Sequence, residues 1–91
     1  LVSGISTVSV ANISMFPNPF HTFSKIDLHD FDADYKNMQV ILFDYLGNKI
    51  MTKQVETNEV VIENNQYLSG VYFLELTNGK KTIGRTKVVI E

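Results

Sequence analysis

The stretch "SGVYFLELTNGKKTIGRTKVVIE", residues 69–91, decides the fold class. Its first half alternates Tyr72, Leu74 and Leu76 with residues of the opposite face, which is the period-two pattern of a β-strand. Asn78-Gly79 then separates this run from a second strand-like run. Asn-Gly between two such runs is the strongest short-range signal for a β-hairpin. The end of the chain is therefore predicted to be a hairpin of two antiparallel strands.

The second strand of this hairpin has Ile83 as one apolar anchor and Val88 to Ile90 as the others. Gly84 lies inside the strand. A glycine within a strand is typical of a β-bulge or of a close approach to the backbone, so we expect one of the two at this position.

A second hairpin is predicted in "NMQVILFDYLGNKIMTKQV", residues 37–55. Gly47 is suited to the positive φ that the turn requires. In the first strand one face is expected to line the core, although both faces are apolar. The expected core residues are Met38, Val40 and Leu42, and the opposite face carries Ile41 and Phe43.

Two shorter segments, "KIDLHDF" at 25–31 and "EVVIENN" at 59–65, add further strands. The chain then holds about seven strands with turn signals between them and no long helical pattern, which favours a seven-stranded antiparallel β-sandwich. Residues 1–12 are expected to be a linker or a loosely attached first strand, and residues 13–91 the domain.

Composition narrows the function classes. The chain has 91 residues, 44% of them apolar and 20% charged, as expected of one small globular domain. A net charge of −2 argues against nucleic-acid binding, and the absence of cysteine means that packing alone holds the fold. No run approaches the length of a membrane span, and the first residues do not resemble a signal peptide. We expect the chain to be part of a longer protein.

The acidic segment "DLHDFDADYKN", residues 27–37, contains the pattern Asp30, Asp32 and Asp34. An EF-hand loop would need Gly and Glu where Tyr35 and Ile41 stand, so the motif fails. The segment is predicted to be a solvated acidic connection, with a weak calcium site of another kind as the alternative.

Catalytic motifs are not evident. His21 and His29 are eight residues apart, which is not a zinc-ligand spacing, and no serine lies in a nucleophile-elbow pattern. We expect neither enzymatic activity nor a cofactor.

The segment "FPNPF", residues 16–20, cannot be a central strand, because Pro17 and Pro19 each lack a backbone donor. It is predicted to be an edge strand that ends in a turn, with Phe16 and Phe20 reaching into the core. The alternative is a recognition element of fixed shape.

A basic cluster marks the last hairpin and consists of Lys80, Lys81, Arg85 and Lys87. Lysines on a terminal strand commonly protect a sheet edge from unwanted pairing. The cluster also gives the domain a positive patch that could contact a partner.

Four features occur in a fixed order: Pro17-Asn18-Pro19, the turn from Asp44 to Gly47, Gly70 with Tyr72, and the basic-to-apolar run from Lys80 to Ile90. Together they resemble the C-terminal sorting domain of the Bacteroidota type IX secretion system, over about residues 13–91. The resemblance implies a non-catalytic, immunoglobulin-like sandwich. In that family the outer-membrane translocon recognises the domain and moves an N-terminal cargo from the periplasm to the cell surface or beyond. A sortase-like peptidase then usually removes the domain, here near or before residues 1–11.

The resemblance does not say which residues the machinery touches. Our hypothesis is that recognition involves Pro17, Asn18, Pro19, Lys80, Lys81, Arg85, Lys87, Val88, Val89 and Ile90. Those expected to shape turns or the core are Asp44, Gly47, Gly70, Tyr72, Asn78 and Gly79. We expect the last strand to be an open sheet edge that offers backbone groups for strand addition. The alternative function is a structural or adhesive module of the fibronectin type, including one that binds glycans. The oligomeric state is left open.

Overall fold

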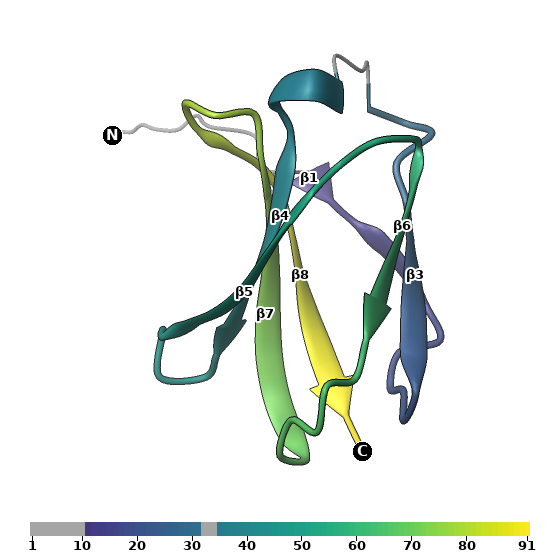
Figure 1. Ribbon diagram of the computed structural model, residues 1–91, viewed down its shortest axis with the longest axis vertical. Helices are drawn as coiled ribbons and strands as arrows, with labels where there is room; N and C mark the ends of the chain where they lie inside the picture. Colours follow the sequence, from purple (N-terminus) through teal and green to yellow (C-terminus); the bar gives the residue numbers. More distant parts are fainter. Residues whose placement is uncertain (1–10, 32–34) are drawn as a thin grey trace, which may run out of the picture.

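A computed structural model of the chain describes residues 11–31 and 35–91 (Figure 1). Most of the predicted linker over residues 1–12 lies outside the described residues. The same holds for Asp32 and Asp34, two of the three calcium candidates. A domain boundary at residue 13 therefore stays a prediction.

Strands form two sheets, seen as two layers in Figure 1. The larger has the order β1-β8-β7-β4-β5, and the smaller has the order β2-β3-β6. Paired strands are antiparallel except β1 and β8, which run parallel over two residues. The bounds are β1 Ala11–Asn12, β2 Ser14–Phe16, β3 Phe23–Asp27, β4 Gln39–Asp44, β5 Lys49–Gln54, β6 Glu59–Glu63, β7 Gly70–Thr77 and β8 Thr82–Ile90, with a 3-10 turn at Tyr35–Asn37.

The predicted all-β class is confirmed, and both predicted hairpins form, as β4–β5 and β7–β8. The strand count is higher than predicted, since the described residues hold eight strands, two of them only two and three residues long. The immunoglobulin-like connectivity stays a prediction.

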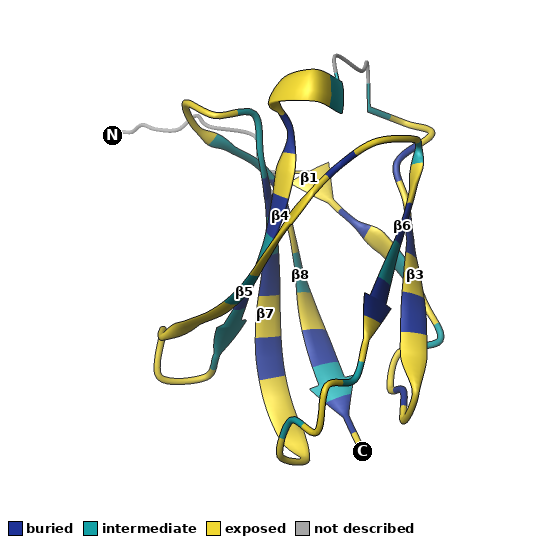
Figure 2. Ribbon diagram, in the orientation of Figure 1, coloured by how far each residue is buried: buried dark blue, intermediate teal, exposed yellow. Residues whose placement is uncertain are grey.

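The core lies between the two sheets, and Figure 2 shows buried residues separated by exposed or half-buried ones along β7 and β8. This alternation follows from the pleat, which turns successive side chains to opposite faces. The residues predicted for the core face of β4 are all buried, with Val40 and Leu42 fully inaccessible. The other buried apolar residues are Ile13, Phe20, Ile26, Leu28, Val55, Val60, Ile62, Tyr72, Leu74, Leu76, Val88 and Ile90.

The two phenylalanines of the "FPNPF" segment differ in burial. Phe20 is 2% exposed and belongs to the core, as predicted, whereas Phe16 is 80% exposed, so its predicted burial is wrong. Phe16 ends the outermost strand of the smaller sheet, where nothing in the described chain covers its side chain. Between them, the Pro17 carbonyl accepts a hydrogen bond from the buried Ser24 hydroxyl at 2.6 Å.

Gly84 lies opposite Leu76, next to the point where the β7–β8 register shifts. A Cβ placed on Gly84 would lie 2.9 Å from Ile13 Cγ1 and 3.1 Å from Phe31 Cζ. The predicted close approach at this glycine is therefore present, and it packs β1 and its flanking residues against β8.

Candidate recognition surface

Asn18 joins the Pro-Asn-Pro segment to the terminal strand. Its side-chain amide donates from Nδ2 to the Lys87 carbonyl at 2.8 Å and accepts through Oδ1 from the Val89 amide at 3.0 Å. The peptide bonds before Pro17 and Pro19 are both cis. A primary amide carries a donor and an acceptor side by side, as a backbone residue of a paired strand does. Asn18 thus pairs with β8 in place of a strand residue.

Flanking backbone groups extend this pairing along β8. The Phe20 amide donates to the Val89 carbonyl at 3.0 Å, and the Phe20 carbonyl accepts from the Glu91 amide at 2.9 Å. Farther along, the Arg85 carbonyl accepts from the Ile13 amide at 3.3 Å. Ile13, Asn18 and Phe20 therefore bond to the edge of β8 that faces away from β7, while β2 between them pairs with β3 in the smaller sheet.

The expectation that the terminal strand is an open edge is wrong. Its outward-facing backbone groups at Arg85, Lys87 and Val89 are bonded to the N-terminal segment, and β1 pairs alongside. A partner could not add a strand here without first displacing Asn18 and Phe20. Any recognition of β8 in the folded domain must use its side chains.

Side chains of the terminal strand divide between two faces. Val88 and Ile90 are 0% and 1% exposed and belong to the core, so no partner can touch them while the domain is folded. Arg85 and Lys87 are exposed, and Val89 is half-buried. Arg85 Nη2 lies 3.2 Å from Glu75 Oε2, directly across from it on β7.

Lys80 and Lys81 lie apart from this strand face, in the β7–β8 turn. The Asn78 carboxamide oxygen accepts from both of their backbone amides at 3.1 Å, and Gly79 has a φ of 91°. The predicted basic cluster is therefore split into a pair at the turn and a pair on β8.

The β4–β5 turn is held by Asp44. Its Oδ1 accepts from the Leu46 and Asn48 amides at 3.0 and 2.9 Å, and its Oδ2 accepts from Asn48 Nδ2 at 3.0 Å. These bonds, chiefly that of the Asn48 side chain, lower the pKa of the Asp44 carboxyl. Gly47 has a φ of 91°, as predicted. The turn presents Tyr45 and Leu46 to solvent, 72% and 73% exposed.

Tyr72 supports the core. It is 7% exposed, and its hydroxyl donates to the Leu68 carbonyl. Its ring centroid lies 6.2 Å from that of Tyr67, and Gly70, two residues earlier, has a φ of 156°. This tyrosine fixes the segment that enters β7 and is not available for contact.

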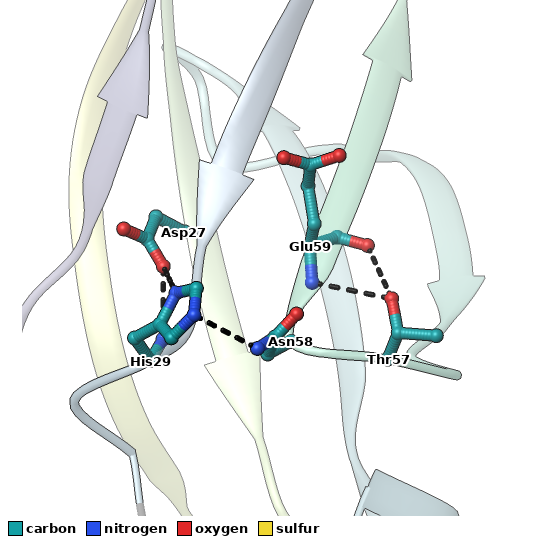
Figure 3. Close-up of polar contacts among 5 residues, drawn as sticks. All are labelled: Asp27, His29, Thr57, Asn58 and Glu59. Carbon is teal, nitrogen blue, oxygen red and sulfur yellow. Dashed lines mark hydrogen bonds and ion pairs between the residues drawn. The ribbon is translucent and has the colours of Figure 1, made fainter.

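A polar group at the end of β3 and the start of β6 contains His29, one of the two histidines whose spacing does not suit zinc (Figure 3). His29 Nδ1 lies 2.5 Å from Asp27 Oδ1, and His29 Nε2 lies 3.0 Å from Asn58 Nδ2. The Asp27 carboxylate raises the pKa of His29, and the His29 backbone amide and ring lower that of Asp27. The Thr57 hydroxyl in the same view bonds to the Glu59 backbone instead. The group ties two strand ends together in solvent.

Over residues 11–31 and 35–91 no group of three or more His, Cys, Asp or Glu side chains is placed to hold a metal ion. In the same part of the chain no helix has the length and apolarity needed to cross a membrane.

Comparison with known proteins decides the family. A family model described as "Secretion system C-terminal sorting domain" matches residues 14–91. The chain belongs to this family. The match spans the Pro-Asn-Pro segment, both hairpins and the terminal strand, and leaves out only β1 and Ile13 of the surface described here. A search of curated proteins finds no match.

Membership makes the domain a C-terminal secretion signal of the type IX system of Bacteroidota, a class of signal that is not catalytic. Proteins that carry such a domain are exported to the cell surface or the extracellular space. The secretion machinery therefore has to recognise and bind the sorting domain.

Proposed function

We propose that the sorting domain acts as a folded address for a cargo attached at its N-terminal side. The outer-membrane translocon binds the folded domain and moves the cargo out of the periplasm. A sortase-like peptidase then cuts near or before residues 1–11 and separates the two. The domain contributes binding surface only, without a cofactor or chemistry of its own.

The observation that supports this proposal is that Asn18 hydrogen-bonds the Pro-Asn-Pro segment to the terminal strand β8. The Pro-Asn-Pro segment and the terminal strand lie some 70 residues apart in sequence, and the Asn18 carboxamide bonds to β8 at two points. A linear terminal peptide would need no such anchor. A recognition surface that depends on the fold would need it, because it sets the two segments in one geometry.

Contacts with the machinery are accordingly assigned to the surface members of the predicted set. These are Pro17, Pro19, Lys80, Lys81, Arg85, Lys87 and Val89. Asn18, Val88 and Ile90 contribute indirectly, since Asn18 anchors the segment and the other two are core residues.

A secretion assay in a Bacteroidota host tests the proposal. A fluorescent reporter with a periplasmic export signal is fused to residues 1–91 and compared with the same reporter without them. We expect the fusion outside the outer membrane and the bare reporter in the periplasm. Retention of both, with the fusion intact by immunoblot, would contradict the proposal and favour the structural or adhesive module.

A further inference from the structure

The outer face of the larger sheet carries a row of four cross-strand neighbours. Lys49 on β5 pairs with Phe43 on β4, Phe43 pairs with Phe73 on β7, and Phe73 pairs with Lys87 on β8. Directly paired residues of antiparallel strands place their side chains on the same face. We call Lys49, Phe43, Phe73 and Lys87 the aromatic row.

Apolar residues border the aromatic row. Val71 and Val89, an adjacent cross-strand pair, lie on one side of it, and Ile41 lies on the other. Phe73 and Val71 are 38% and 42% exposed. The solvent face of an antiparallel sheet is usually polar, and a contiguous exposed apolar patch commonly marks an interaction site.

The β4–β5 turn borders an open hollow on this face. Beside the aromatic row lies a hollow of about 470 Å³, lined by residues that include Phe43, Tyr45, Leu46, Phe73, Glu75 and Arg85. The Asp44 bonds described above hold the turn that presents Tyr45 and Leu46. A hollow between aromatic side chains suits an apolar side chain from a protein partner, which is how interface anchors are commonly seated.

The charged residues of this face indicate which groups a partner would carry around its apolar side chain. Within residues 11–31 and 35–91, neither Lys49 nor Lys87 has an ion-pair partner, whereas Arg85 is paired with Glu75. The two free ammonium groups flank the aromatic rings and would complement carboxylates on a partner. If two copies met through this same face, the carboxylates near the lysines would be those of Asp44 and Glu75, which are already bonded.

We propose that the aromatic row is a docking site for a protein of the export machinery. That protein inserts an apolar side chain into the hollow and places carboxylates opposite Lys49 and Lys87. This inference rests on the proposed function and names the surface that the export machinery binds. An anionic membrane is the poorer match, because the domain has a net charge of −2 and Glu75 lies in the hollow.

The test compares two phenylalanines that differ mainly in the sheet that carries them. Phe73→Thr removes the centre of the aromatic row, and Phe23→Thr removes a phenylalanine of similar exposure, 43%, from the smaller sheet. Both variants are placed in the reporter fusion with residues 1–91, beside the unmodified fusion. We expect Phe73→Thr to lower export at least about tenfold, as loss of an interface anchor does, and Phe23→Thr to leave it unchanged.

Folding and lipid controls complete the test. Thermal melts of the purified domains report whether both variants fold. If Phe73→Thr does not, the double variant Lys49→Gln and Lys87→Gln replaces it, with Lys25→Gln as its control. The purified domains are also sedimented with phosphatidylglycerol vesicles.

The outcomes separate this inference from the proposed function. If the unmodified fusion is not exported, the proposed function fails. If it is exported and Phe73→Thr is exported equally well, the docking site is refuted while the proposed function stands. Equal losses in both phenylalanine variants also refute the site. Vesicle binding that depends on Phe73 would assign the face to lipid and overturn the protein partner.

Discussion

Replacing Asn18 by alanine tests the bond between the Pro-Asn-Pro segment and the terminal strand. The substitution removes the donor to the Lys87 carbonyl and the acceptor for the Val89 amide. It deletes no buried apolar side chain, because Asn18 is exposed. Any loss of stability is therefore due to the two hydrogen bonds.

The size of the effect follows from the environment of those bonds. A hydrogen bond in a folded protein contributes about 0.5–1.5 kcal/mol net, so two contribute about 1–3 kcal/mol. Water can reach both backbone groups once the carboxamide is gone, so the lower half of the range, about 1–2 kcal/mol, is expected. In a domain of this size each kcal/mol lowers the melting temperature by about 4–8 °C.

Urea denaturation of the purified domain measures this effect. The midpoint should fall while the slope m stays unchanged, since the surface exposed on unfolding is the same. Asn65→Ala is the matched control, because Asn65 is also exposed and has no hydrogen bond to β8; it should stay within about 0.5 kcal/mol of the unmodified domain. An Asn18→Ala domain as stable as the Asn65→Ala domain would refute the reasoning.

Other variants test the packing, the turn and the terminal strand. Gly84→Ala should lower the free energy of unfolding by about 1–3 kcal/mol, because its Cβ would lie 2.9 Å from Ile13 Cγ1; an unchanged thermal melt would contradict the packing. The bonds to Asp44 lower its pKa in the folded state, so they stabilise the fold above the ordinary value of 3.8, and this contribution is lost as pH falls through the lowered pKa. Asp44→Asn should therefore be less stable than the unmodified domain near neutral pH and approach it in acid, and a urea-midpoint gap that does not vary with pH would be inconsistent with this. A chain that ends at Thr86 loses two buried β8 side chains at about 2–5 kcal/mol each, against a typical total of about 5–15 kcal/mol. Its circular dichroism should be that of an unfolded chain. A native β spectrum with a cooperative melt would contradict the assignment of Val88 and Ile90 to the core.

Much of the core was predictable because a strand has a period of two. Once Asn78-Gly79 is identified as a turn, the alternation of Tyr72, Leu74 and Leu76 assigns one face of β7 to the core. The glycines at 47 and 84 were predictable for a similar reason, since each marks a local constraint that the sequence shows directly.

The pairing partner of the terminal strand was not predictable in this way. Its outer edge is bonded by Asn18, whose importance depends on contacts some 70 residues away in sequence. No local pattern shows such a contact, so the strand was predicted to be an open edge. The exposure of Phe16 was missed for a similar reason, because the edge position of its strand was predicted but the sequence does not show which of its side chains the assembled fold covers.

The aromatic row was also not identified from the sequence. Ile41 and Phe43 were placed on the second face of β4. Only the cross-strand register shows that Phe43 lies beside Phe73 and that Lys49 and Lys87 flank this pair. Residues from four strands form this surface, and their alignment is a property of the assembled sheet.

The central claim is that the secretion machinery recognises a surface of the folded domain and not a linear terminal peptide. Leu74→Asp in the reporter fusion tests this most directly, because it places a charge at a fully buried core position while residues 75–91 keep their sequence. The account predicts that this fusion, intact by immunoblot, stays in the periplasm while the unmodified fusion is exported. Export of the Leu74→Asp fusion at the unmodified level, with the domain shown to be unfolded by circular dichroism, would contradict it.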